Sequence, residues 1–138
     1  MQENAFQIFA FYAAANALIM LVLGMLVVRA RVKTRTNIGD GGIPEMAGPL
    51  RAHANNTEYV PMALILMWLT LTLGGSIWLI HGAGLPLTIG RLIHGFALSR
   101  NTGPSAGRFI GMILTWIAYV VAIVGVVYLA ATTMTAAS

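Results

Sequence analysis

The sequence contains no cysteine, and only 9% of its 138 residues are charged. Without cysteine there is no disulfide framework, and the composition says nothing about the redox compartment. Any reaction at a thiol must therefore use a thiol that a ligand brings. Such a low content of charge also argues against a water-soluble domain.

Several functional motifs are missing as well. The chain has no serine-nucleophile motif, P-loop or dinucleotide-binding fingerprint. Its three histidines, His53, His81 and His94, are scattered with no carboxylate at ligand spacing, so we expect no metal site. No long internal repeat supports an inverted-repeat transporter. The sequence is basic without a pattern of nucleic-acid recognition, so we expect membrane lipid as a partner and no nucleic acid.

Hydrophobic residues dominate what is present, at 58% of the chain. Four apolar stretches, at about 5–28, 59–80, 84–99 and 107–131, approach the roughly 20 residues that a bilayer-spanning helix needs. The third stretch is the weakest, because it is short and contains Arg91 and His94. The sequence predicts an all-α integral membrane four-helix bundle. It forms a single domain, 1–138, with helices at about 5–28, 49–80, 84–100 and 104–131.

The basic residues indicate a topology. With four alternating spans, all eight lie on or lean toward one side, which the positive-inside rule assigns to the cytoplasm. The N-terminus with Glu3, the HGAGLP turn and the uncharged TTMTAAS tail then share the other side, so both termini face outward. We expect a multi-pass protein of a bacterial inner membrane, with its site facing the cytoplasm.

The segment RAHANNTEYVP places polar residues at the start of a membrane helix. Because a helix turns about 100° per residue, Arg51, Asn55 and Glu58 share a stripe roughly 60° wide, and His53 lies opposite. Such a stripe is costly in a bilayer unless it meets polar partners or a polar ligand. We interpret it as half of a binding site. A structural network between helices, with Glu58 pairing to Arg91, is the alternative.

Two further helices add cationic groups. Pro49 and Pro104 suit the first turn of the second and fourth helices, with Asn101, Thr102 and Gly103 as cap candidates for the fourth. Both N-termini then point to the cytoplasmic side with free N–H groups, where anions are stabilised. Arg91 and His94 share one face of the third helix. The glycines at 103, 107 and 111 have the spacing of a close helix-packing surface.

The segments RAHANNTEYVP and GRLIHGFALSRNTGPSAGRFIGM resemble motifs of the MAPEG superfamily, the membrane-associated proteins of eicosanoid and glutathione metabolism. The resemblance covers nearly the whole chain and is nearest to microsomal glutathione transferases and leukotriene-forming synthases. It implies a homotrimer with glutathione sites between neighbouring subunits, open to the cytoplasm and to the bilayer. By motif match, glutathione is held by Arg51, Asn55, Glu58 and Tyr59.

The resemblance also implies roles on the other helices. Arg91 matches the third-helix arginine that binds glutathione, and His94 matches its polar or aromatic companion with a catalytic role. Arg108 matches the arginine that stabilises the thiolate, with Arg100 as a competitor. Arg29 or Arg31, at the end of the first helix, contributes at the cytoplasmic rim of the glutathione site. Many active relatives have a tyrosine where this chain has Leu98, a departure that weakens the enzyme interpretation.

The chemistry of glutathione agrees with this set. Its two carboxylates, ammonium and thiol need guanidinium groups, one carboxylate and a cationic field over sulfur. We therefore expect a glutathione transferase, with glutathione as co-substrate and with peroxidase activity as an extension, acting on lipophilic electrophiles from the bilayer. Two alternatives stay open: a non-catalytic lipid-binding or accessory protein of the same fold, and a small structural subunit of a larger membrane complex.

Overall fold

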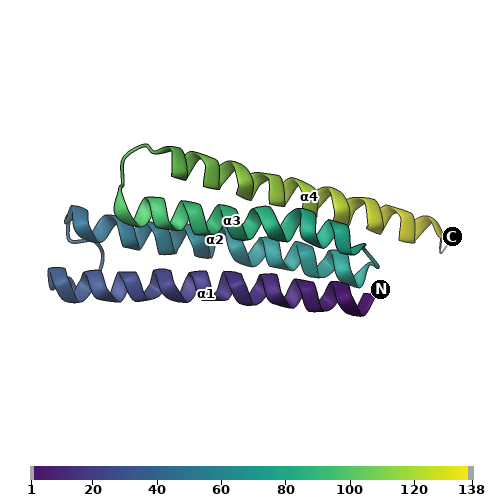
Figure 1. The fold of residues 1–138 in the computed structure, drawn as a ribbon, viewed down its shortest axis with the longest axis horizontal. Helices are drawn as coiled ribbons and strands as arrows, with labels where there is room; N and C mark the ends of the chain where they lie inside the picture. The colour runs from purple at the N-terminus through teal and green to yellow at the C-terminus, as the bar shows by residue number, and fades with distance from the viewer. Residues whose placement is uncertain (1, 137–138) are drawn as a thin grey trace.

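The computed structural model describes residues 2–136, which fold into four α-helices without a β-strand in that range. The helices are α1 (Gln2–Thr34), α2 (Pro44–Thr72), α3 (Ile77–Arg100) and α4 (Ala106–Ala136). They lie lengthwise beside one another, with α1 and α4 on opposite flanks of α2 and α3 (Figure 1). The expected all-α, four-helix architecture is confirmed.

The two ends of the bundle differ in charge. The start of α1, the end of α4 and the α2–α3 turn lie at one end, whereas the α1–α2 and α3–α4 loops lie at the other (Figure 1). The helix ends and loops at that second end contain seven of the eight basic residues: Arg29, Arg31, Lys33, Arg35, Arg51, Arg100 and Arg108. This is the distribution that the positive-inside interpretation requires. The orientation in a membrane stays a prediction.

Two helices have the length and hydropathy of membrane spans, over Asn4–Thr34 and Ala106–Thr135. The other two, α2 and α3, fall short because polar side chains such as Glu58 and Arg91 interrupt their apolar runs. Two of the four expected spans are therefore supported by hydropathy.

The boundary between the second and third helices differs from the expected one. Helix α2 ends at Thr72, and HGAGLP lies inside α3 instead of forming the turn. The N–H of Gly75 bonds to the carbonyl of Thr70 at 2.8 Å, and the N–H of Gly74 bonds to that of Leu71 at 3.0 Å. These two bonds form a Schellman motif, which needs a left-handed residue, and Gly74 has φ 79°. The chain therefore turns at residues 73–76.

The expected helix starts also shift. Helix α2 begins at Pro44, where proline suits the first turn, and Pro49 lies inside the helix. Helix α4 begins after Ser105, whose Oγ accepts a hydrogen bond from the N–H of Arg108 at 3.3 Å. Ser105 is thus the N-cap, in place of the expected residues 101–103.

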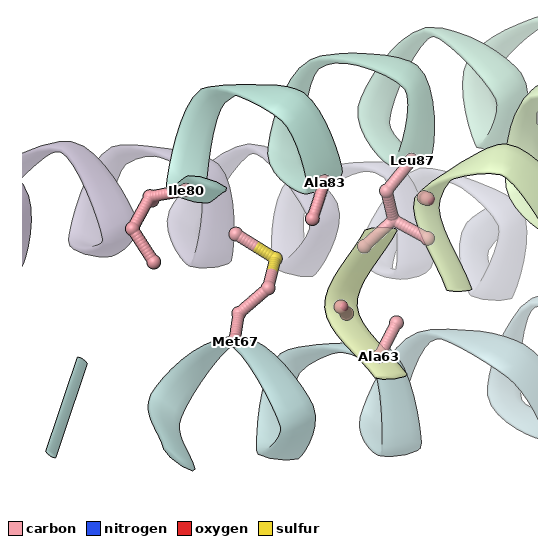
Figure 2. Close-up of a cluster of buried hydrophobic side chains, with 7 residues drawn as sticks. Ala63, Met67, Ile80, Ala83 and Leu87 are labelled. Carbon is pink, nitrogen blue, oxygen red and sulfur yellow. The ribbon is translucent and has the colours of Figure 1, made fainter. Parts of the chain in front are cut away.

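The main core joins α2, α3 and α4. Met67 and Ala63 of α2 point toward Ile80, Ala83 and Leu87 of α3, and Met67 reaches across the space between the two helices (Figure 2). The spacing of three or four residues keeps each set on one helical face. The alanines let the backbones approach closely, which is how helices pack in membranes.

Glycines let α3 and α4 approach closely. A Cβ on Gly111 would lie 2.7 Å from the carbonyl oxygen of Gly90 and 2.6 Å from the Cβ of His94. A Cβ on Gly107 would lie 2.9 Å from that of Ala97. The packing interpretation of the glycine repeat therefore holds for Gly107 and Gly111, whereas Gly103 lies in the loop before α4.

Candidate functional site

Arg91 lies at the centre of a polar network between α2, α3 and α4. Its side chain is 1% exposed. The guanidinium donates from NH1 to Asn55 Oδ1 at 2.8 Å, from Nε to Thr115 Oγ1 at 3.0 Å and from NH2 to Met112 Sδ at 3.3 Å. The guanidinium carbon, Cζ, lies 5.3 Å from the ring centroid of Tyr59. The structure thus brings together three of the predicted site residues, Asn55, Tyr59 and Arg91.

The partners of Arg91 are held in place by further hydrogen bonds. The hydroxyl of Thr115 donates to the carbonyl of Gly111 at 2.8 Å, which leaves its oxygen free to accept from Arg91. The hydroxyl of Tyr119 donates to the carbonyl of Tyr59 at 2.6 Å, and the two rings meet edge to face at 6.0 Å. Arg91 is therefore fixed from both α2 and α4.

The charge of Arg91 has no acidic partner within residues 2–136. Its oxygen acceptors are an amide and a hydroxyl, and its third acceptor is a thioether sulfur. The alternative ion pair between Glu58 and Arg91 is not formed within the described chain. A guanidinium has five N–H donors, so donors remain beyond these three bonds. A buried cation without a counter-charge is costly, and an anionic ligand would offset that cost.

His94 and Arg108 border a groove next to this network. The groove has a volume of about 540 Å³, and its wall includes His94, Arg108, Met112 and Trp116. His94 Nδ1 lies 3.0 Å from the carbonyl oxygen of Arg108, which fixes the ring against the first turn of α4. Met112 also accepts the hydrogen bond from Arg91, so it links the groove to the buried guanidinium.

Arg108 lies in the first turn of α4, where the N–H groups and the helix dipole attract negative charge. Its NH1 donates to the carbonyls of Thr102 and Gly103, at 2.6 and 2.7 Å. Arg100, the competing arginine, instead lies over the ring of Phe96 at 3.9 Å. Of the two, only Arg108 lines the groove with His94.

The α2 stripe divides between the inside and the outside of the chain. Asn55 faces Arg91, whereas Arg51 and Glu58 are exposed. Neither of these two makes a side-chain hydrogen bond or ion pair within the described residues. The single chain therefore assembles the inner half of the predicted set and leaves two charged members on its surface.

The two α1 arginines lie apart from the network. Arg29 is exposed near the end of α1. Arg31 donates from NH1 to the carbonyls of Thr36, Asn37 and Gly39 at 3.0–3.2 Å, and so holds the α1–α2 loop. Their expected contribution at the rim stays a prediction.

Sequence reasoning missed the contribution of α4. Met112, Thr115 and Tyr119 fall on one helical face and all touch the network, with Trp116 beside them on the groove. The available signal was the pair of polar residues, Thr115 and Tyr119, at i and i+4 within an apolar run.

A second polar cluster joins α1 and α3 toward the other end of the bundle. Tyr12 Oη lies 2.8 Å from His81 Nδ1, and Asn16 Nδ2 donates to Thr88 Oγ1 at 2.8 Å. His81 is thus a hydrogen-bond partner of Tyr12 across the two helices. Gly84 leaves the space that the Tyr12 ring occupies.

Leu98 lies where the resemblance of the sequence implies a tyrosine. Its side chain is 6% exposed and packs with Leu23 and Ala52 between α1, α2 and α3. It lies outside the groove that His94 and Arg108 line. The position one turn after His94 therefore serves packing in this chain.

Comparison with known proteins places the chain in a family. The sequence pattern of the MAPEG family matches residues 9–128. The chain is 36% identical over 109 residues to Inner membrane protein YecN of Escherichia coli strain K12, with 79% of this chain and 82% of that protein covered. The same values hold for Inner membrane protein YecN of Escherichia coli O6:H1 strain CFT073. The chain is therefore a membrane protein that belongs to the MAPEG family.

Proposed function

We propose that this protein is a glutathione transferase of the bacterial inner membrane that joins glutathione to lipophilic electrophiles, with peroxidase activity toward lipid hydroperoxides as an extension of the same chemistry. The protein acts as a homotrimer, and its sites lie between neighbouring subunits and open toward the cytoplasm. The observation that carries the proposal is the buried guanidinium of Arg91, held by Asn55 and Thr115 without an acidic partner in residues 2–136.

The carboxylates of glutathione fit this guanidinium. A carboxylate accepts two parallel hydrogen bonds from an arginine fork, and such charge-assisted bonds are roughly twice as strong as neutral ones. Because Asn55, Thr115 and Tyr59 already fix Arg91, little side-chain entropy is lost when the anion binds.

The groove suits the thiol. Arg108 at the N-terminus of α4 places positive potential beside His94, and positive potential stabilises a thiolate relative to a thiol. The thiolate then attacks the electrophile, so that a carbon–sulfur bond forms while the bond to the leaving group breaks with its electron pair. Phe109 and Trp116, which are 69% and 52% exposed, give the groove an apolar wall for a substrate that arrives from lipid.

The exposed pair on α2 supports a site completed by a second copy. Glu58 lies 14 residues into α2, about 21 Å from the helix start, and has no partner within the described chain. An acid at that depth is costly when it faces lipid. In a homotrimer, Glu58 meets the ammonium of glutathione and Arg51 its second carboxylate.

Titration of the purified protein with glutathione tests the proposal. We expect binding that Glu58→Gln weakens and that Arg35→Gln, a surface charge on the α1–α2 loop, leaves unchanged. The ultraviolet absorbance of bound thiolate should fall in Arg108→Ala. The absence of detectable glutathione binding would remove the proposal.

A second candidate is a MAPEG protein that binds lipid or glutathione without turnover. The buried Leu98, packed away from the groove, favours it because no tyrosine hydroxyl is available at that position. Turnover of a lipophilic haloarene with glutathione distinguishes the two. Binding without turnover supports the second candidate, and turnover that Arg108→Ala reduces supports the first.

A further inference from the structure

A separate apolar groove lies between α1 and α3, away from the Arg91 network. It has a volume of about 210 Å³ and an almost entirely apolar lining, which includes Leu18, Val22 and Leu26 from α1 and Leu92, Gly95 and Phe96 from α3. A Cβ on Gly95 would lie 3.1 Å from the side chain of Leu23, so the bare glycine lets Leu23 pack closely against α3 beside this groove. Leu18, Leu92 and Phe96 are each more than half exposed, at 61%, 58% and 56%.

The two walls of this groove end at the same level. Helices α1 and α3 run in the same direction (Figure 1). Asn16 bonds to Thr88, 72 positions further along the chain. Leu23 contacts Gly95 with the same offset, so the register is constant along the pair. Arg29 and Arg100 differ by nearly that offset and therefore lie at the same height.

Both arginines are placed to meet a ligand in the groove. Arg29 is exposed and follows Leu18, Val22 and Leu26 on one face of α1, because it lies 11, 7 and 3 residues after them. Arg100 lies over the ring of Phe96, one wall of the groove, at 3.9 Å. Neither arginine forms an ion pair within the described residues. The apolar groove thus ends at two arginines.

The dimensions match one leaflet of a bilayer. Eleven residues separate Leu18 from Arg29, which corresponds to about 16 Å along a helix. Half of a hydrocarbon core of about 30 Å is about 15 Å. A lipid tail in the groove therefore places its headgroup beside the arginines.

We propose that this groove is a binding site for an anionic phospholipid, with one acyl chain between α1 and α3 and the phosphate between Arg29 and Arg100. Arginine suits this role because its fork binds phosphate oxygens in pairs. This groove shares no lining residue with the groove of His94 and Arg108. Arg29 is the one residue that is also predicted, as an alternative to Arg31, at the rim of the glutathione site.

The absence of cysteine allows a direct test. A single Leu92→Cys variant, labelled with bimane and reconstituted in phosphatidylcholine vesicles, places a fluorophore in the groove. The mole fraction of nitroxide-labelled phosphatidylglycerol that gives a set degree of quenching should be at least about fivefold lower than that of nitroxide-labelled phosphatidylcholine. The reason is that each basic residue adds about a fivefold preference for an anionic headgroup.

Charge variants in the same background complete the experiment. Combined Arg29→Gln and Arg100→Gln should make the two lipids quench equally, whereas Arg35→Gln, which removes one charge beyond the end of α1, should keep most of the preference. Equal quenching by both lipids in the parent would overturn the proposal. Disulfide-linked dimers through Leu92→Cys would overturn it too, because a second copy would then cover the groove.

Discussion

The guanidinium of Arg91 donates a hydrogen bond to the side-chain oxygen of Asn55 at 2.8 Å, although the two residues lie on different helices and 36 positions apart. This bond ties the polar stripe of α2 to the middle of α3. It also fixes the orientation of a charge that would be costly inside a bundle without hydrogen-bond partners.

Arg91→Met should abolish glutathione binding while leaving the thermal stability unchanged or higher. An apolar side chain of similar volume needs no counter-charge, and replacing buried charge in this way is often neutral or stabilising. Arg91→Lys should weaken binding about tenfold or more, because an ammonium cannot form the paired hydrogen bonds of a guanidinium. Calorimetric titration and thermal unfolding in detergent measure both effects. Full affinity in Arg91→Met would contradict the assignment.

Asn55→Asp should separate stability from binding. The new carboxylate would lie beside the Arg91 guanidinium and form an ion pair there, so the fold should be kept. Because that carboxylate would already neutralise the guanidinium that glutathione needs, the affinity for glutathione should fall about tenfold or more. Asn55→Ala, the control, should lower both stability and affinity modestly. If Asn55→Asp binds glutathione as tightly as the parent, the ligand does not meet Arg91.

Gly111→Ala should destabilise the bundle by about 1–3 kcal/mol, because its Cβ would lie 2.7 Å from the carbonyl oxygen of Gly90. Gly24→Ala on α1 is a matched control, since its Cβ would meet His53 at an ordinary 3.6 Å. That change should be neutral or stabilise by up to about 1 kcal/mol through helix propensity. Thermal unfolding in detergent compares the two, and an equal response would argue against close packing of α3 on α4.

Tyr12→Phe should lower stability by about 0.5–1.5 kcal/mol through loss of the contact with His81, without changing glutathione affinity. Tyr128→Phe, at a 65% exposed tyrosine of α4, should change neither. Unfolding and titration together test whether the Tyr12 cluster is structural. A drop in affinity in Tyr12→Phe would connect that cluster to the binding site.

The sequence was sufficient for the architecture and for half of the network. The 100° rotation per residue put Arg51, Asn55 and Glu58 on one stripe, and the apolar stretches indicated four helices. It could not show that Asn55 turns inward while Arg51 and Glu58 stay on the surface. That division depends on how α2 packs against α3. A stripe about 60° wide can lie partly inside and partly outside the interface between two helices.

The α4 contribution was hidden for a different reason. Threonines in apolar helices commonly donate to a carbonyl one turn back, as Thr115 does to Gly111, so their presence does not indicate a partner on another helix. The turn between α2 and α3 was misplaced because both LGGS and HGAGLP contain glycines. Only the backbone bonds around Gly74 decide between them.

The four-residue turn at 73–76 also bears on how the protein reaches its membrane. Neither α2 nor α3 alone has the hydropathy of a membrane span. The two helices are joined by a tight turn at Gly74. We expect them to insert as one helical hairpin, in which Asn55 and Arg91 shield each other from acyl chains during biogenesis. Mutations at Arg91 would then alter the yield of inserted protein as well as the proposed binding of glutathione.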